Sequence, residues 1–567
     1  MGTTLVPGKL ERLMESEPVW KTRGYALAAV VIALGFWLAT QAYFVPVTRG
    51  GDRNGYLLGG KMLAEGNWRG IEPADAYEYL GPHWVKLESG RFALKYPLGL
   101  PVVYAVLHGV VGGAHWMAAA HEVSPLLAAL GVLGTFFLFR PIVGSCAAIG
   151  GMILVATSPP TFFFANLPNS HACAFCAAVW GMHFLLQWWR SDLLWQGIAA
   201  GLLLGFNVTV RYTEGLLLIP IILVALFAHG WNRKAIMKSL PIFVAWLVLP
   251  VSQVSYNLAV LHHATGYALT HESTAFSLGN FAANWQRMLG ELGNTMAFLS
   301  PVAILGAVLM FRAQRRLAVV LIVWALGTIL VYTAYYWTPG EEPGLSYTRF
   351  VLTALPALVV MAMWPLQWIA RRGIAPLLLV VAIVTAAAVV DMRFAVARAV
   401  DLKRDNLACE ALVRQVLANV PQGSVIFVDQ ANAAPLQVAG DYRLYLADLF
   451  TARYVNSFAT VNADEPQVLQ AERAQELYRR LGGRSDADLA TEENRLMGTA
   501  VAQGRKVYAA LPANECEQFE RRFVKGRGWT ARVVASWEAG TAQSVVSNLP
   551  AVVGDEIIEV TAIMPMN

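Results

Sequence analysis

A carboxylate that is suited to acid–base chemistry lies just beyond the first long apolar run of the chain. Asp52 belongs to the glycine-rich segment GGDRNGYLLGGKMLAEG, in which Tyr56 and Lys61 follow on an expected helix. Partial burial at the mouth of an apolar bundle would raise the pKa of Asp52 towards working pH and make it a general base. The alternative role is that of an N-cap for this helix, and the two roles are compatible.

Two arginines lie at the ends of apolar runs, where a fixed charge is costly unless it is paired or functional. Arg211 occurs in VTVRYTEG, and Glu214, three residues on, is its local partner in a structural ion pair. Arg349 follows Tyr347 at the mouth of a later run. Its planar guanidinium suits a phosphate or pyrophosphate, and interfacial anchoring is the alternative.

A membrane-embedded chain must position these groups. The 567 residues are 56% hydrophobic and 14% charged, with a mean hydropathy of +0.47, which predicts an integral membrane protein. The net charge of +5 is a small surplus spread over the whole chain, which argues against nucleic-acid binding. Residues 401–567 hold 21 of the 38 acidic and 17 of the 43 basic residues, so a boundary near 400 separates a lipid-embedded part from a water-facing part.

Apolar runs predict eleven transmembrane helices, since a hydrocarbon core of ~30 Å takes about 20 helical residues. The runs are 24–46, 122–139, 142–162, 170–189, 193–210, 213–230, 239–258, 292–311, 317–337, 348–370 and 373–392. Lys and Arg clusters at alternate connections then lie in the cytoplasm. This topology requires the run 97–118 to be a re-entrant or interfacial helix, which its prolines and glycines favour. The loop 47–121 and the tail then face the external side.

The tail alternates strand and helix patterns, which predicts a small external α/β domain at 401–567 after a transmembrane domain at 1–400. Strands are expected at 424–429, 506–511, 531–536 and 556–563. Helices are expected at 403–419, 465–481 and 515–525, the last with a capping-box-like start formed by Asn514 and Glu517.

Cysteine and histidine patterns define no metal site. Cys173 and Cys176 have C-x-x-C spacing inside an apolar run, where a small buried hydrophobic residue is the expected role. A second polar cluster has a spacing that fits no standard metal site, so a solvated loop is expected there. Its residues are His262, His263, His271 and Glu272. No metal ligand is assigned, and a need for a divalent metal is left open. Cys409 and Cys516 would be able to form a disulfide if the tail is external.

The order of several short motifs resembles the GT-C membrane glycosyltransferases, which include protein O-mannosyltransferases and the aminoarabinose transferase of lipid A. The motifs are Asp52, the Y-x6-L-x2-G pattern from Tyr56, the K-Y-P-x-G-x-P loop at 95–101 and Y-T-R-F-x-L-x-A-L-P at 347–356. The resemblance covers roughly residues 20–370. It implies an all-α polytopic bundle and a donor sugar carried on a polyprenyl phosphate.

The resemblance also implies roles for individual residues. Asp52 would act as catalytic base on the acceptor or position it, and Lys95 and Arg211, joined on physical grounds by Arg349, would bind the donor phosphate. Interfacial snorkelling is the alternative for Lys95. The residues assigned to substrate binding are Tyr56, Tyr96, Glu214, Asn169, His171 and Tyr347.

The sequence departs from the family pattern in two loops. Arg53 follows Asp52 where many members carry a second acidic residue, and Asn169, with His171 nearby, stands where the family often has an Asp. A second carboxylate, if one is needed, would come from elsewhere. The candidates are Glu272, Glu341 and Glu342.

We therefore expect an inverting-type glycosyltransferase of a plasma or inner membrane, with its active site and tail on the external (periplasmic) side. The expected partners are membrane lipids, the lipid-linked donor and a protein, lipid or glycan acceptor. The alternatives are a ligase or oligosaccharyltransferase of a lipid-linked glycan, phosphoryl-type transfer to a lipid, and a non-catalytic or transport subunit. A transporter predicts ionisable groups near the bilayer midplane, and these are close to absent from the runs.

Overall fold

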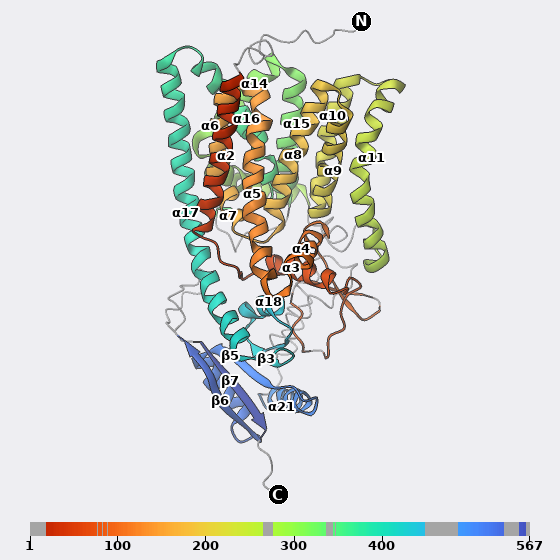
Figure 1. The fold of residues 1–567 in the computed structure, drawn as a ribbon, viewed down its shortest axis with the longest axis vertical. Coiled ribbons are helices and arrows are strands. Elements are labelled where there is room, and N and C mark those ends of the chain that lie inside the picture. Colours follow the sequence, from red (N-terminus) through yellow and green to blue (C-terminus); the bar gives the residue numbers. More distant parts are fainter. Residues whose placement is uncertain are drawn as a thin grey trace. The chain divides into compact units, whose positions relative to one another are not determined.

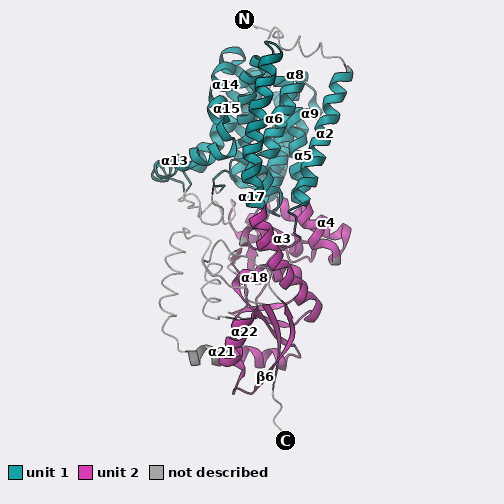
Figure 2. Ribbon diagram, turned by 90° about the vertical axis from the view of Figure 1, so that its left-hand side faces the viewer, with its two compact units in different colours: residues 1–44, 123–253, 275–399 teal, residues 45–122, 254–274, 400–567 magenta. Residues whose placement is uncertain are grey.

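The computed structural model of the chain (Figure 1) describes residues 19–75, 77–81, 83–87, 89–264, 276–335, 344–345, 347–447, 486–537 and 555–562. It divides into two compact units, each built from separate stretches of the chain (Figure 2). Unit 1 comprises residues 1–44, 123–253 and 275–399, and unit 2 comprises residues 45–122, 254–274 and 400–567. The first long loop therefore belongs to the same unit as the tail, whereas the division at residue 400 remains a prediction.

Unit 1 is helical. Its helices are α2 (Val19–Gln41), α6 (Ser145–Thr157), α7 (Pro159–Ala165), α8 (Ser170–Ser191), α9 (Leu194–Val210), α10 (Leu218–His229), α13 (Leu278–Thr295), α14 (Ser300–Ala313), α15 (Arg315–Thr333) and α16 (Leu355–Ala370). Three further helices contribute residues to both units, namely α5 (Gly113–Val143), α11 (Arg233–Tyr256) and α17 (Ile374–Asn419).

Among the described residues, eight helices are long and apolar enough to cross a membrane, and α6 with α7 makes a ninth if the bent pair is one span. The predicted polytopic bundle is thus confirmed, but three of the eleven predicted runs differ from simple spans. The run 142–162 bends by 58° between α6 and α7, where Pro159 and Pro160 begin a new helix. The run 193–210 forms the short helix α9. The run 292–311 is interrupted at Ala297, whose φ is 46°, before α14 begins.

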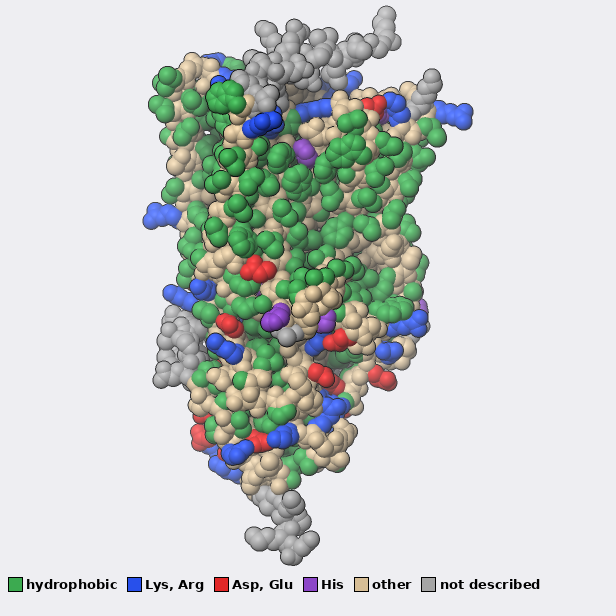
Figure 3. Space-filling model, in the orientation of Figure 1, with side chains coloured by type: hydrophobic (Ala, Val, Ile, Leu, Met, Phe, Trp, Pro, Cys, Tyr) green, Lys and Arg blue, Asp and Glu red, His purple; other side chains and the backbone are tan. Residues whose placement is uncertain are grey.

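The surface of unit 1 is apolar, as expected for helices in contact with lipid. Large side chains such as Leu27, Ile304 and Leu378 are more than 60% exposed. Figure 3 shows hydrophobic side chains covering most of the visible face of the helical unit. In water such a surface would drive aggregation, so this exposure supports the membrane assignment.

The run 97–118 forms a helix too short to span a bilayer. Helix α4 (Gly99–Val111) has 13 residues and ends at Gly112, whose φ of 77° suits glycine, before α5 begins at Gly113. The prediction that this run is not a simple span agrees with its length.

The tail of unit 2 forms a five-stranded sheet in the order β4-β3-β5-β7-β6. The strands are β3 (Val425–Val428), β4 (Arg443–Leu446), β5 (Val507–Pro512), β6 (Trp529–Trp537) and β7 (Asp555–Ala562). Strand β3 pairs in parallel with β4 and β5, whereas β7 pairs antiparallel with β5 and β6. The helices that accompany the sheet are α18 (Gln430–Ala439), α21 (Asp486–Ala502) and α22 (Ala513–Phe519).

The four predicted strands of the tail are confirmed. Strand β4, which has only four residues, was not predicted from the sequence. The helix predicted at 403–419 is the end of α17, and the one at 515–525 is α22 with a π-helical turn after it. The cap of α22 is Pro512, without a side-chain hydrogen bond, so the predicted capping box at Asn514 was wrong. The helix expected at 465–481 lies outside the described residues. Cys409 and Cys516 are free, buried thiols rather than a disulfide.

The first loop is built into the core of the tail. It contains α3 (Gly51–Ala64) and the hairpin of β1 (Trp84–Lys86) and β2 (Phe92–Leu94). Val47 and Tyr79 belong to the same hydrophobic cluster as Ile426 and Val428 of the sheet. The backbone N–H of Tyr79 donates to the carbonyl of Leu444 over 2.8 Å, which extends the sheet beyond β4.

Candidate active site

The segment before α3 places Asp52 in the first turn of that helix. Gly50 is the N-cap, with a φ of 108° that favours glycine, so Asp52 is not the cap that sequence reasoning offered as the alternative. The Asn54 amide fixes this turn by donating to the carbonyls of Thr48 (2.8 Å) and Gly50 (2.9 Å). A carboxylate in the first turn also interacts favourably with the positive end of the helix dipole.

Asp52 is joined to the K-Y-P loop by one short hydrogen bond. The hydroxyl of Tyr96 donates to Oδ1 of Asp52 over 2.7 Å, and the ring of Tyr96 packs on that of Tyr56 with centroids 4.6 Å apart. The ammonium of Lys95 lies 5.6 Å from the centre of the Tyr96 ring. Four of the predicted site residues therefore gather in unit 2. The Asp52 carboxylate is exposed, whereas the sequence analysis expected partial burial.

Arg53, the residue that follows Asp52, makes a local contact. Its Nη1 donates to the carbonyl of Arg49 over 3.1 Å, four residues earlier in the chain. The guanidinium thus helps to hold the turn that leads into α3, next to Asp52 in sequence. This contact explains how the turn accommodates a positive charge at this position.

His83 is a buried group near this site that sequence reasoning missed. It is fully buried, and neither ring nitrogen has a hydrogen-bond partner among the described residues. Burial, assisted by the charge of Lys95 and opposed by that of Asp52, lowers the pKa of His83 to about 3, so the ring is neutral at physiological pH. A single His in the segment GPHWV carries no recognisable motif, and only the fold brings it beside the loop.

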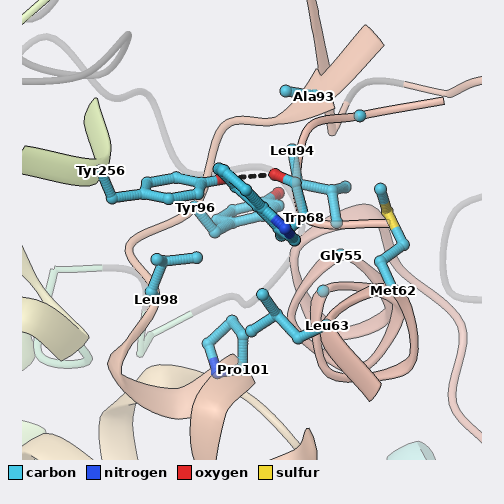
Figure 4. Close-up of a pocket in the computed structure, with 12 residues that line it drawn as sticks. Gly55, Met62, Leu63, Trp68, Ala93, Leu94, Tyr96, Leu98, Pro101 and Tyr256 are labelled. Carbon is cyan, nitrogen blue, oxygen red and sulfur yellow. Dashed lines mark hydrogen bonds between the residues drawn. The ribbon is translucent and has the colours of Figure 1, made fainter. Parts of the chain in front are cut away.

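An apolar pocket lies against the ring of Tyr96 (Figure 4). The side chain of Tyr96 therefore faces Asp52 with its hydroxyl and the pocket with its ring. Tyr256 closes the pocket from another segment of unit 2, and its hydroxyl donates to the carbonyl of Trp68 over 3.1 Å. The pocket is lined by Gly55, Gly59, Met62, Leu63, Trp68, Gly70, Ala93, Leu94, Tyr96, Leu98, Pro101 and Tyr256.

A second group of predicted residues gathers in unit 1 around Arg211, which is 7% exposed. The guanidinium donates to Nδ1 of His171 over 2.5 Å and to the hydroxyl of Tyr332 over 2.8 Å. Its Nε lies 4.0 Å from Oε1 of Glu214, which also accepts a bond of 3.2 Å from the hydroxyl of Thr353. The local ion pair that the spacing predicted is present, within a larger buried network.

Asn169 and His171 reach this network through the start of α8. Asn169 is the N-cap, and its side-chain oxygen accepts a hydrogen bond from the backbone N–H of His171 over 3.3 Å. The cap thereby fixes the first turn, from which the His171 ring extends to Arg211. Asn169 thus has a structural role as the cap of α8.

Arg349 lies on the same aromatic ring as Arg211. The guanidinium carbon of Arg349 is 4.5 Å from the centre of the Phe350 ring, and that of Arg211 is 5.3 Å away. Phe350 stacks on Tyr332 with a centroid distance of 4.6 Å and an interplanar angle of 9°. Neither Phe350 nor Tyr332 was assigned to the site from sequence, because isolated aromatic residues at the end of apolar runs are usual in membrane proteins.

Tyr347 is fully buried, and its backbone lies beside the buried carboxylate of Glu291, which the sequence analysis did not single out. The backbone N–H groups of Tyr347 and Thr348 donate to Oε2 of Glu291 over 2.7 and 3.2 Å, and Arg287 lies 3.7 Å from Glu291 Oε1. Burial raises the pKa of Glu291, against the opposing effect of these hydrogen bonds and of Arg287. Glu291 thus anchors the segment that carries Tyr347 and Arg349.

Within the described part of the chain, no three or more His, Cys, Asp or Glu side chains form a group that could hold a metal ion. Three of the acidic residues considered as a second carboxylate, and one of the loop histidines, lie outside the described residues. These are Glu272, Glu341, Glu342 and His271.

Comparison with known proteins supports the GT-C resemblance. Residues 96–256 match the sequence model of the family described as dolichyl-phosphate-mannose-protein mannosyltransferase. The match includes Tyr96, Asn169, His171, Arg211 and Glu214, but not Asp52, Lys95, Tyr347 or Arg349. No curated protein matches the sequence.

Solved structures show the same fold over nearly the whole chain. ArnT from Cupriavidus metallidurans, solved with undecaprenyl phosphate, is 14% identical, with a TM-score of 0.54 over 94% of this chain and 98% of that one. The apo oligosaccharyltransferase of Archaeoglobus fulgidus is 12% identical, with a TM-score of 0.50 over 87% of this chain and 70% of that one. With its apolar helices and its C-terminal sheet, this chain therefore has the fold of the GT-C superfamily of membrane glycosyltransferases.

Proposed function

We propose that this protein transfers a sugar from a polyprenyl-phosphate-linked donor to a protein, lipid or glycan acceptor on the external, periplasmic face of its membrane. The observation that carries the proposal is the pair of buried arginines around Phe350, in a chain whose fold matches that of a protein solved with undecaprenyl phosphate. The family match at residues 96–256 supports the same class of donor.

The charges of the Arg211 network favour an anionic ligand. Arg211 and Arg349 are 7% and 8% exposed, and Glu214 is the carboxylate that pairs with Arg211. Both guanidinium groups lie against the Phe350 ring, so two planar cationic groups are present at one buried position. A phosphate oxygen would neutralise this charge, and the planar guanidinium forks suit its geometry.

The proposed chemistry needs one base and a stabilised leaving group. Asp52 removes the proton of the acceptor hydroxyl as the oxygen attacks the anomeric carbon, and the bond from that carbon to the phosphate oxygen breaks. The departing polyprenyl phosphate keeps the bonding electrons, and Lys95, Arg211 or Arg349 neutralises its charge. A single displacement of this kind inverts the anomeric centre.

Transfer of a preassembled glycan is the second candidate. The likeness to the oligosaccharyltransferase of Archaeoglobus fulgidus favours it, although at 12% identity this likeness concerns the fold. The two candidates differ in the donor, which carries one sugar on a phosphate in the first case and an oligosaccharide in the second. A donor comparison therefore separates them.

The test uses the full-length protein in lipid nanodiscs with polyprenyl-phosphate monosaccharides, and it measures release of the polyprenyl phosphate. We expect turnover that Asp52→Asn lowers by about 10²- to 10⁴-fold, the usual contribution of a general base. Asp192→Asn is the matched control, since Asp192 is a half-exposed acid of unit 1 that pairs with Lys238. Wild-type turnover in Asp52→Asn, or turnover with oligosaccharide donors alone, would contradict the proposal.

A further inference from the structure

Helix α3 is closely packed on one face, where its glycines leave little room for a Cβ atom. A Cβ atom added at Gly55 would lie 2.2 Å from the ring of Tyr96, and one at Gly60 would lie 2.4 Å from Cβ of Tyr104. At Gly59 the corresponding distance to Pro101 is 3.1 Å. The glycines thus allow the segment of Tyr96 and α4 to lie directly on the helix that carries Asp52.

Near its other end, α3 is fastened to the α/β fold of the tail by Lys61. The ammonium donates to the carbonyl of Gly440 over 2.8 Å and to that of Gln437 over 3.4 Å, at the carboxyl end of α18. The final carbonyls of a helix lack intrahelical donors and carry partial negative charge, so a cation satisfies them well. Burial lowers the pKa of Lys61, and the carboxylates of Glu65 and Asp441 oppose this effect.

Helix α18 is in turn held by the sheet. Asp429 follows β3 and caps α18 by accepting hydrogen bonds from the backbone N–H groups of Ala431 (2.8 Å) and Asn432 (3.1 Å). The Gln437 side chain also donates to the carbonyl of Tyr79 in the first loop over 3.3 Å. A continuous series of hydrogen-bonded and packed elements therefore runs from β3 through α18 and Lys61 to α3.

We propose that Lys61 is a positioning residue that aligns Asp52 and Tyr96 by fastening α3 to the carboxyl end of α18, so that the tail acts as a support for the reacting carboxylate. Lys61 lies nine positions after Asp52, or roughly 14 Å along a helix, so a small tilt at Lys61 moves the carboxylate. Two kinds of measurement test this proposal. The measurements of turnover rest on the proposed glycosyl transfer, whereas the measurement of hydrogen exchange does not.

Turnover is measured for three variants of the full-length protein. Lys61→Met keeps the apolar stem and removes the donor, Lys61→Arg restores a donor, and Lys506→Met changes an exposed lysine of the tail that pairs with Glu559. We expect Lys61→Met to lower kcat about 10- to 100-fold with an unchanged KM for the lipid donor, because misplacement of about 1 Å is costly in this range. Lys61→Arg should recover most of the loss, and Lys506→Met should match the wild type.

A double-mutant cycle with Tyr96→Phe separates positioning from simple stabilisation. If Lys61 acts through the alignment of Tyr96 with Asp52, the combined loss of kcat should be clearly smaller than the product of the single losses. If Lys61 only stabilises the fold, Lys61→Met would lower the Tm but leave kcat per folded molecule unchanged. That result would overturn the proposal.

Hydrogen exchange measures the fastening without any substrate. In the substrate-free full-length protein, the amides of residues 51–57 should exchange at least several-fold faster in Lys61→Met than in the wild type or Lys506→Met. Equal rates would overturn the positioning role. A wild-type protein inactive on every donor, with faster exchange in Lys61→Met, would refute the proposed function but retain the fastening of α3.

Discussion

The two groups of candidate residues hold their charges in different ways. In unit 1, Arg211 is buried and engaged with His171, Tyr332 and Glu214. In unit 2, the carboxylate of Asp52 is exposed and bonded to Tyr96 at the start of a helix in a long loop. A buried network is preorganised to receive a charge, whereas an exposed carboxylate is accessible to an incoming acceptor and can exchange a proton with it.

The largest expected effect comes from comparing Asp52→Asn with Arg211→Met. The first variant should lose kcat by about 10²- to 10⁴-fold with little change in Tm, because it removes a base from an exposed position. The second should lose stability by roughly 3 kcal/mol, because it leaves Glu214 buried without its cation. Steady-state kinetics and thermal unfolding on the same nanodisc samples measure both quantities. A large fall in Tm for Asp52→Asn would remove the distinction between the two groups.

Arg349→Gln should weaken binding of polyprenyl phosphate by about 10-fold or more, since a charge-assisted hydrogen bond contributes about 1.5–3 kcal/mol. Titration of the substrate-free protein with polyprenyl phosphate measures this affinity. The control is Arg316→Gln, because Arg316 is exposed and donates to the carbonyl of Phe227. Equal affinities for the two variants would argue that Arg349 is an anchor and not a phosphate ligand.

Tyr96→Phe should have a smaller effect, about 3- to 10-fold on kcat. The ring still fills the wall of the pocket, but Asp52 loses the hydrogen bond that orients it, which is worth about 1 kcal/mol. Tyr56→Phe provides the comparison, since its ring also packs here. If Tyr96→Phe changed the KM for donor and left kcat intact, the hydroxyl would act on the donor and not through Asp52.

The last prediction concerns stability alone, namely the dependence of unit 2 on pH. Burial, reinforced by Asp429 and opposed by Arg49, raises the pKa of Asp555 to about 6 from its ordinary 3.8. The folded form then binds a proton more readily than the unfolded chain, so this group stabilises the fold below about pH 4 and loses that contribution as pH rises through about 6. The Tm of the wild type should therefore fall relative to that of Asp555→Asn between pH 4 and 7. Parallel curves would contradict this.

Sequence patterns located single elements well, because local composition determines them. Strands β3, β5, β6 and β7 appear within two residues of their predicted bounds, and the apolar runs all contain helices. The ion pair of Arg211 with Glu214 followed from their spacing on one short segment. Contacts across longer separations were not visible: Asp52 and Tyr96 were both named, but no pattern indicated that they bond to each other.

Residues without a motif were missed for the same reason. His83 gains its surroundings from a loop and a hairpin, and Glu291 is a carboxylate on a helix that ends where a span was expected to begin. Tyr332 and Phe350 become part of the Arg211 network only when α15 and the segment before α16 are folded. In each case the chemistry depends on tertiary contacts and not on neighbours in sequence.

The shared core of the first loop and the tail has a consequence for the order in which the protein is made. Roughly 280 residues separate the end of that loop from the start of the tail part of unit 2. At about 5–20 residues per second, a ribosome needs roughly 14–56 s to cover this distance. During that time the strands against which Val47 and Tyr79 pack have not yet been synthesised. The candidate base is therefore among the early residues to be synthesised but among the last to reach its final environment, and a nascent chain stopped before the tail would be a substrate for quality-control proteases.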